Sequence, residues 1–316
     1  FASRGYVAVG HEIGALPFLQ TPGSWRISFD LLMLGLFGGF YIVPLYALIL
    51  TRWGERHRSR IIAGNNILND LFLILAAVLA IVVFHFGFSI PQLFLIAAIL
   101  NACVAIYIYT LVPEFLMRFI MWILIHSVYR LKKEGLRNIP DEGAAVLVCN
   151  HVSFVDALVI AAGCPRPIRF VMDHNIFKVP LLNFVFRTAK TIPIASAKED
   201  SQALERAYDE VAKALKDGDL VGIFPEGKIT STGDMNEFKS GIKRIIDRTP
   251  VPVIPLALRG LWGSFFSRMG GKAMSRFFPR GISSKIELAA GAPISPTQVT
   301  PESLHDTVQA LRGDWK

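Results

Sequence analysis

The chain has 316 residues, of which 52% are hydrophobic and 18% are charged. Soluble globular proteins average about 45–50% apolar and about 25% charged residues, so this composition excludes a disordered chain and argues against a purely soluble one. The 33 basic and 25 acidic residues give a net charge of +8, which in a membrane protein favours anionic lipid or acidic partners. No zinc-finger spacing or basic reading helix is present, so we do not predict nucleic-acid binding.

Three cysteines, Cys103, Cys149 and Cys164, occur at irregular spacing. An odd, irregular set predicts neither a disulfide framework nor a zinc site, so we expect buried, reduced thiols and no bound metal. The chain begins at Phe1, and its first 28 residues lack the pattern of a signal peptide. We therefore expect it to be a piece of a longer protein.

Two long stretches without acidic or basic residues, 31–51 and 71–113, indicate membrane-spanning helices. About 20 apolar residues cross a bilayer, so residues 1–113 are predicted to be a transmembrane region. The three predicted spans lie near residues 29–51, 61–86 and 91–112.

The basic residues predict the orientation of these spans. The loop 52–60 and the segment 118–137 are both basic, and two crossings separate them. Both should therefore lie on the cytoplasmic side. Between the third span and the next region, residues 114–130 are apolar but too short to span, which predicts an interfacial amphipathic helix.

Polar residues form a stripe on the second predicted span. Their spacing places them on one helix face, where they either bond to a neighbouring helix or line a substrate path. The members are Asn65, Asn66, Asn69 and Asp70.

Three stretches, 38–45, 57–60 and 63–66, resemble the closing helices of bacterial lysophospholipid transporters of the major facilitator superfamily. The resemblance covers about residues 25–112. It implies the last three of twelve helices, a bacterial inner (cytoplasmic) membrane, and a following domain on the cytoplasmic side. Because the other nine helices are absent from this sequence, we do not expect this chain alone to transport.

From residue 131 to residue 316, short apolar runs alternate with amphipathic stretches, which predicts a cytoplasmic α/β domain. The predicted strands are 144–149, 220–224, 251–258 and 285–288. The predicted helices are 153–163, 201–216 and 301–311.

The segment 150–156 follows a predicted strand and opens a predicted helix. A turn there can bring the Asp156 carboxylate to one imidazole nitrogen of His151, leaving the other nitrogen free as a base. Capping of the helix by Asn150 or Ser153 explains the same polar cluster, so both interpretations stay open.

The segment 224–232 also follows a strand. Gly227 frees the backbone, Lys228 adds a positive charge, and the hydroxyl residues 230–232 follow, which together suit a phosphate cradle. A nucleotide-binding P-loop is disfavoured because Ile229 stands where Ser or Thr would hold magnesium.

Taken together, the His-x4-Asp motif, Phe-Pro-Glu-Gly at 224–227, and the segments 238–241 and 253–255 resemble the PlsC-type glycerolipid acyltransferases over about residues 131–300. The residues after Lys228, and the transporter-like helices, look most like the 2-acylglycerophosphoethanolamine acyltransferase branch. Lys228-Ile229 replaces the usual Thr-Arg. The second family motif lacks its Arg, so either Lys190 substitutes for it or the headgroup pocket differs.

The resemblance implies transfer of a fatty acyl group from acyl carrier protein or coenzyme A to the free hydroxyl of a lysophospholipid. That acceptor is expected to be lysophosphatidylethanolamine, in phospholipid salvage. The alternatives are a lysophosphatidic acid acyltransferase of de novo synthesis and a transporter fragment with an accessory domain. No cofactor is expected beyond the thioester co-substrate. The implied catalytic residues are His151 and Asp156, and the implied substrate-binding residues are Glu226, Gly227, Lys228, Thr230 and Lys190.

The stretch 170–186 is unusually apolar, which fits either a core segment or an acyl-chain tunnel with a membrane-dipping surface. The candidate chain-binding residues are Phe170, Met172, Phe177, Leu181 and Phe184. A basic cluster nearby fits either a solvated face or a contact with anionic lipid or acyl carrier protein. It comprises Arg166, Arg169, Lys178, Arg187 and Lys190.

Overall fold

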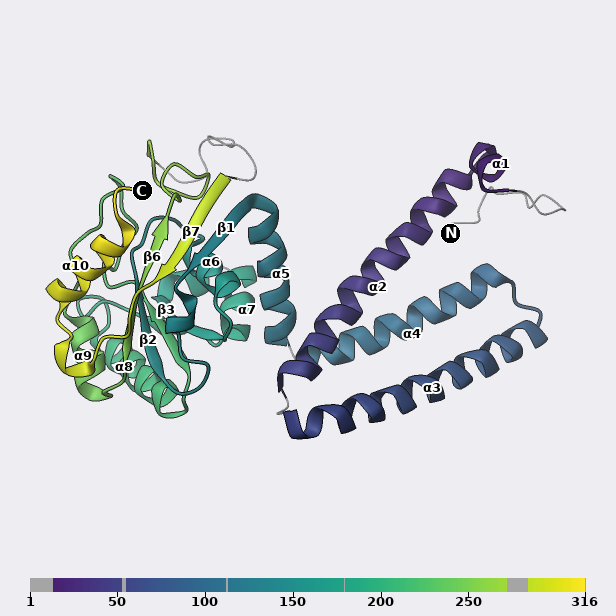
Figure 1. The fold of residues 1–316 in the computed structure, drawn as a ribbon, viewed down its shortest axis with the longest axis horizontal. Coiled ribbons are helices and arrows are strands. Elements are labelled where there is room, and N and C mark those ends of the chain that lie inside the picture. The colour runs from purple at the N-terminus through teal and green to yellow at the C-terminus, as the bar shows by residue number, and fades with distance from the viewer. Residues whose placement is uncertain (1–13, 53–54, 112, 179, 272–283, 316) are drawn as a thin grey trace. The chain divides into compact units, whose positions relative to one another are not determined.

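The computed structural model describes residues 14–52, 55–111, 113–178, 180–271 and 284–315 (Figure 1). The chain divides into two compact units, Phe1–Leu111 and Val112–Lys316. Each unit has its own architecture.

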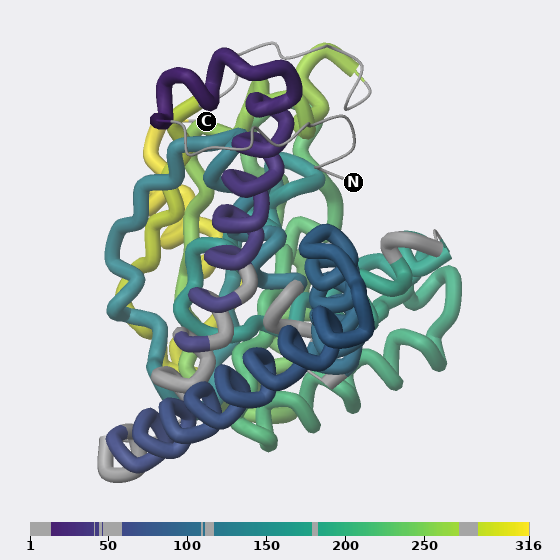
Figure 2. Tube along the Cα trace, turned by 90° about the vertical axis from the view of Figure 1, so that its right-hand side faces the viewer, coloured from purple at the N-terminus to yellow at the C-terminus, as the bar shows by residue number. Residues whose placement is uncertain are grey.

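The first unit is helical (Figures 1 and 2). Within it, Ser59–His85 and Ile90–Ile108 are long and apolar enough to cross a membrane. The first predicted span coincides with a helix, but many of its side chains lie outside the described residues, so a third span stays a prediction. The helices are α1 (Ala15–Gln20), α2 (Ser24–Arg52), α3 (Glu55–His85) and α4 (Ile90–Leu111).

Two features of α3 refine the sequence analysis. The helix begins at Glu55, so most of the predicted loop 52–60 is helical, as its good helix formers permit. The side-chain amides of Asn65 and Asn69 both donate to the Tyr46 hydroxyl on α2, at 2.9 and 3.3 Å. This contact favours interhelical hydrogen bonding as the role of the polar stripe.

The second unit is built on a mixed sheet of seven strands in the order β1-β7-β6-β2-β5-β3-β4. Every neighbouring pair is parallel except β6 and β7, which are antiparallel. The strands are β1 (Tyr129–Glu134), β2 (Ala145–Cys149), β3 (Ile168–Asp173), β4 (Ile192–Ile194), β5 (Leu220–Ile223), β6 (Val253–Arg259) and β7 (Ser284–Ala290).

Helices cover both faces of this sheet, and alternate strand residues separate two cores. Leu147 and Ile254 pack on the α6 side, whereas Val146 and Val253 pack under α8, α9 and α10. The helices are α5 (Pro113–Val128), α6 (Asp156–Gly163), α7 (Pro180–Thr188), α8 (Ser201–Lys216), α9 (Gly241–Arg248) and α10 (Pro301–Arg312). Short 3₁₀ turns are η1 (Leu136–Asn138), η2 (His174–Lys178) and η3 (Pro296–Gln298).

Helix α5 occupies the segment predicted to lie at the membrane interface. It belongs to the second unit, where Met121 and Ile125 are buried and the helix packs against α6. Trp122 and Leu124 remain exposed on its other side. An apolar helix with one face buried in the domain and another uncovered is compatible with an interfacial position, which stays a prediction.

Candidate active site

The turn that follows β2 begins with Asn150, whose fully buried side chain extends the sheet. Its Nδ2 donates to the Leu258 carbonyl at 3.0 Å, and the Leu258 N–H donates to its Oδ1 at 2.8 Å. The amide thus mimics one more residue of β2 paired with β6. Val155, rather than Asn150 or Ser153, is the N-cap residue of α6.

His151 and Asp156 meet across this turn, with Nδ1 of the imidazole 2.8 Å from Oδ2 of the carboxylate. The Asp156 carboxylate is buried and also accepts the backbone N–H groups of Val152 and Ser153, at 2.6 and 2.9 Å, and the Ser153 hydroxyl at 2.6 Å. So many donors, together with the α6 N-terminus, stabilise the anion. An ionised carboxylate can only accept hydrogen bonds, so Nδ1 of His151 is the donor in its contact with Asp156.

These same bonds explain why α6 begins later than predicted. The carboxylate of Asp156 reaches back to the backbone of residues 152 and 153, so that stretch forms the turn and the helix starts at Asp156. The turn leaves 22% of the His151 side chain exposed, while Asp156 is fully buried.

Behind the imidazole stands a column of aromatic rings. The rings of His151 and Phe224 are stacked at 4.3 Å, and Phe224 is near-parallel to Phe170 at 6.1 Å. Gly222 makes room for this column, because a Cβ there would lie 2.6 Å from Phe170 Cε1. Phe170, predicted to contact the acyl chain, is buried in the core beneath the imidazole.

Glu226 is 1% exposed and ties two loops together. Its Oε1 accepts the His151 backbone N–H at 2.7 Å, and its Oε2 accepts the backbone and side-chain N–H groups of Asn236, both at 2.7 Å. Burial raises the pKa of the Glu226 carboxyl, and these hydrogen bonds oppose the rise. Protein donors occupy both oxygens, so this geometry fits a role in holding the loops.

Thr230 makes a second connection to the same turn. Its backbone N–H donates to the His151 carbonyl at 3.0 Å, and its Oγ1 accepts the Gly233 N–H at 3.1 Å. The Thr230 hydroxyl is thus engaged within its own loop, whereas the side chain of Lys228 is exposed. Of the predicted cradle residues, Lys228 has the freedom to meet a ligand.

Lys239 is a cation that the sequence analysis did not single out. Its backbone N–H donates to the Pro225 carbonyl at 3.0 Å, and its side chain crosses the bare α-carbon of Gly227. A Cβ on Gly227 would clash with Nζ and lie 3.0 Å from Cε, and the φ of +68° also favours glycine. The only signal in the sequence was the resemblance of residues 238–241 to a family motif.

Lys190 does not join this group. It precedes β4, and its carbonyl accepts from Arg169 Nε at 3.1 Å. In the sheet, β5 and β3 lie between β2 and β4, and neighbouring strands are about 4.8 Å apart, so Lys190 lies on the far side of two strands from β2 and His151. The structure therefore does not bring Lys190 to His151.

The basic cluster around Lys190 is largely engaged within the protein. Arg166 donates to the carbonyls of Pro140, Gly143 and Gly218 at 2.8–2.9 Å, and Arg169 pairs with Asp219. Guanidinium groups held in this way anchor loops, which limits how many of them remain for a partner.

The other predicted chain-binding residues have mixed environments. Met172 is half-buried against the core, and the ring of Phe177 lies 5.9 Å from that of Phe186. Phe184 on α7 is 62% exposed, and the side chain of Leu181 lies outside the described residues. Phe170 is buried and Phe184 is exposed, so these positions differ in how accessible they are to a ligand.

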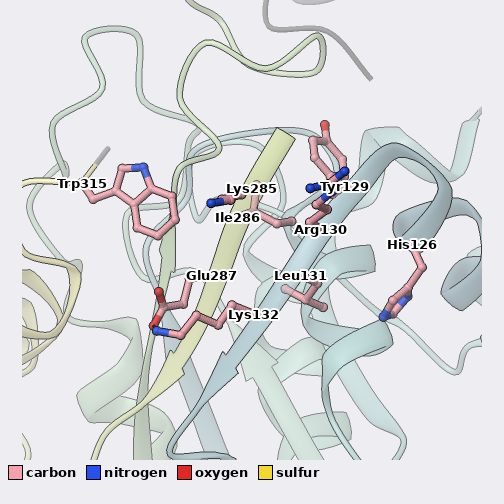
Figure 3. Close-up of a pocket in the computed structure, with 9 residues that line it drawn as sticks. All are labelled: His126, Tyr129, Arg130, Leu131, Lys132, Lys285, Ile286, Glu287 and Trp315. Atoms are coloured by element: carbon pink, nitrogen blue, oxygen red, sulfur yellow. The ribbon is translucent and has the colours of Figure 1, made fainter. Parts of the chain in front are cut away.

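A separate groove of about 540 Å³ lies along β1 and β7 (Figure 3). Its buried Glu287 pairs with Lys132 at 3.3 Å and with Arg259 at 3.0 Å, so the carboxylate of Glu287 is compensated. Trp315 and Lys285 complete the same face of the strand pair. Within the described ranges, no group of three or more His, Cys, Asp or Glu side chains is arranged to hold a metal ion.

The second unit is thus an α/β domain with a His–Asp pair in the turn that follows a strand. The comparisons specify the class, because residues 130–259 match the family model described as Acyltransferase. The second unit therefore contains an acyltransferase domain.

The chain spans 38% and 39% of the length of the first two curated relatives that it matches. A chloroplast 1-acyl-sn-glycerol-3-phosphate acyltransferase of Arabidopsis thaliana is 30% identical over 43% of this chain and 38% of its own length. The Bacillus subtilis enzyme of the same name is 25% identical over 41% of this chain and 63% of its own length. The crystal structure of the PlsC enzyme of Thermotoga maritima covers 77% of this chain and 94% of its own, with 21% identity and a TM-score of 0.49.

Proposed function

We propose that this protein is a membrane-bound glycerolipid acyltransferase that moves a fatty acyl group from an acyl thioester to the free hydroxyl of a lysophospholipid. The observation that carries the proposal is the 2.8 Å contact between His151 Nδ1 and the buried Asp156 carboxylate. This contact leaves Nε2 of a partly exposed imidazole as the basic nitrogen.

In the proposed reaction, Nε2 of His151 removes the proton of the acceptor hydroxyl as its oxygen attacks the thioester carbonyl. The carbon–oxygen ester bond forms, the carbon–sulfur bond breaks, and the thiolate leaves with the proton that His151 returns. Asp156 keeps Nδ1 protonated and stabilises the transient imidazolium. No covalent enzyme intermediate is required.

The remaining site residues have supporting roles in this proposal. Glu226 holds the His151 backbone against the following loop, and Thr230 closes that loop. Lys228 and Lys239 supply positive charge for the acceptor phosphate, with Gly227 admitting the Lys239 side chain. Met172, Phe177 and Phe184 are offered as contacts for the acyl chain, whereas Lys190 is left out because of its position.

The acceptor we favour is lysophosphatidylethanolamine. Two features support this choice: Lys228-Ile229 replaces the usual Thr-Arg, and residues 25–112 resemble lysophospholipid transporter helices. The second candidate is 1-acylglycerol 3-phosphate, which the names of the relatives favour.

The acyl donor is either acyl carrier protein or coenzyme A thioester. The basic segments flanking the apolar helices support a cytoplasmic active site on a bacterial inner membrane. The same helices would place a transporter part and an acyltransferase on one polypeptide.

The test uses the full chain purified in detergent, with both acceptors and both thioester donors offered in parallel. We expect His151→Ala to lower the rate by about 10²–10⁴-fold, the usual contribution of a general base. His126→Ala, on α5 and stacked on Trp122, is the matched control and should keep the wild-type rate.

Retention of more than about a tenth of the activity by folded His151→Ala would contradict the base role. Transfer to 1-acylglycerol 3-phosphate alone would replace the favoured acceptor with the second one. Absence of transfer from folded wild-type protein to either acceptor would overturn the proposed function.

A further inference from the structure

We propose that the loop after β6, together with Phe154 of the turn after β2, contacts an anionic lipid surface beside the active site. The contact is made by three exposed residues, Phe154, Arg268 and Met269, which we name the rim patch. Phe154 is 49% exposed and Met269 is 47% exposed, although both side chains are apolar. Single apolar side chains on a surface are ordinary, and these two are informative because of where they lie.

The loop is joined directly to the turn that holds the His–Asp pair. The Phe154 N–H donates to the Phe266 carbonyl at 3.1 Å, and Ser153 forms an isolated antiparallel bridge with Ser267. Ser153 also bonds to the Asp156 carboxylate. These bonds therefore hold the loop, and any surface that it contacts, close to His151.

The first residues of the loop are fixed, and the exposed residues that it gives to the rim patch follow them. Leu261 is fully buried in the core, and the Ser267 hydroxyl accepts from the Gly263 N–H at 3.0 Å and donates to the Ser264 carbonyl at 2.9 Å. Beyond these bonds, Arg268 and Met269 are exposed. Residues 261–267 are thus held by the core and by hydrogen bonds, and they present Arg268 and Met269 at the surface.

Arg268 supplies the charge of the rim patch. Its guanidinium lies 5.6 Å from the centre of the Phe154 ring, within the range of a cation–π contact. No described acidic side chain pairs with it, so its charge is available to an anion. An arginine laid over an exposed aromatic ring combines a charged and an apolar contact in one place.

The surrounding sequence has the same character. Residues 248–286 contain no Asp or Glu. An anionic membrane attracts each nearby Lys or Arg by about 1 kcal/mol, so this charge bias favours such a surface. Arg248 and Arg259 in that range pair with acidic side chains of other segments, so the basic residues that contribute to this bias are Arg268, Lys272, Arg276, Arg280 and Lys285.

A lipid surface fits the rim patch better than an acidic protein does. Large apolar side chains flanking a cation are typical of groups that enter the headgroup boundary of a bilayer. An acidic protein would satisfy Arg268 but would leave Phe154 and Met269 without a matching apolar layer. If the proposed function holds, the contact would also keep an acceptor hydroxyl at headgroup depth near His151.

The test places a fluorescent reporter in the loop of the full chain. Met269→Cys is made with Cys103→Ser, since Cys149 and Cys164 are buried, and labelled with an environment-sensitive dye. The protein is reconstituted in phosphatidylcholine vesicles with and without phosphatidylglycerol. Lys216→Cys, exposed at the end of α8, is the matched control site.

We expect a blue-shifted emission at position 269, and quenching by lipid-borne quenchers, in the vesicles that contain phosphatidylglycerol. Added salt and Arg268→Gln should both weaken the signal, and the label at position 216 should not respond. Because the readout needs no turnover, loss of acyl transfer with an intact shift would refute the proposed function alone.

Three results would overturn the inference. The label at position 269 could stay in water in both kinds of vesicle, or both label sites could respond equally. The third is a shift that requires added acyl carrier protein and not anionic lipid, which would identify an acidic protein as the partner.

Discussion

At the scale of single residues, the two charged side chains at the loop around Glu226 have different surroundings. The Glu226 carboxylate is buried, and both of its oxygens accept hydrogen bonds from protein N–H groups. The Lys239 ammonium, in contrast, lies across Gly227 without a described partner. The first arrangement maintains the loop, and the second leaves a cation for a ligand. Substitutions at the two positions should therefore have different consequences.

Lys239→Met should weaken the use of phosphate-bearing acceptors. A hydrogen bond to a charged group contributes about 1.5–3 kcal/mol, which corresponds to roughly a 10- to 100-fold fall in kcat/KM. Transfer to 1-monoacylglycerol, which has no phosphate, should change little. Steady-state kinetics on both acceptors measures the difference, with Lys216→Met as the control; an equal fall on both would indicate a merely structural Lys239.

Glu226→Gln should change how stability depends on pH. Burial raises the pKa of this carboxyl above its unfolded value, so its favourable contribution is fully present below the unfolded pKa and declines as pH rises through the folded one. Glutamine does not titrate. The melting temperature of the wild type relative to Glu226→Gln should therefore fall with rising pH, and a constant difference would contradict the raised pKa.

At the scale of elements, β5 positions the active site through an absent side chain. Gly222 lets the Phe170 ring lie against the strand, where it supports Phe224 and, through it, the His151 imidazole. The backbone of the strand is ordinary at Gly222, so glycine is needed there only because a side chain would not fit. That makes the column open to a direct test.

Gly222→Ala should push the Phe170 ring and disturb the column. Overpacking a core usually costs about 1–3 kcal/mol, and kcat should fall with it because the imidazole loses its support. Replacing the ring in the double variant Gly222→Ala, Phe170→Leu frees the space. We expect this double variant to recover melting temperature relative to Gly222→Ala but not kcat, because the Phe170 ring is gone; full recovery of kcat would show that the column does not position His151.

How much of the fold was predictable depended on element length and burial. Apolar runs located β2, β5, β6 and β7, and amphipathic spacing together with end signals located α8 and α10. The missed β4 has three residues including Pro193, and β1 is an edge strand in which charged side chains follow Tyr129. Such segments become strands through their neighbours in the sheet, which local sequence does not reveal.

For the active site too, contacts within one turn were predictable and contacts between distant segments were not. The approach of His151 to Asp156 was predictable because the two residues are only five positions apart and lie in the same turn. The contacts of Glu226 with His151 and Asn236, and the position of Lys239, depend on loops from distant strands. The distance between Lys190 and His151 was likewise set by strand order, which the sequence analysis did not predict.

At the scale of the whole molecule, the two units bury their apolar residues differently. Both hydrophobic cores consist of residues of the second unit, from Ile125 on α5 to Val308 on α10. In the first unit, large side chains such as Phe72 and Ile106 are exposed, as suits helices surrounded by lipid or by further helices. The second unit should therefore fold without the first, provided that it keeps α5.

A variant lacking residues 1–111 should fold cooperatively in mild detergent, whereas one lacking residues 1–128 should melt at a lower temperature. The reason is that Met121 and Ile125 are buried, and removing them uncovers the apolar surface of α6. Circular dichroism melting of both variants, with gel filtration, measures the difference. Equal melting temperatures would mean that α5 contributes nothing to the core, and an unfolded or aggregated longer variant would mean that the first unit is needed for folding.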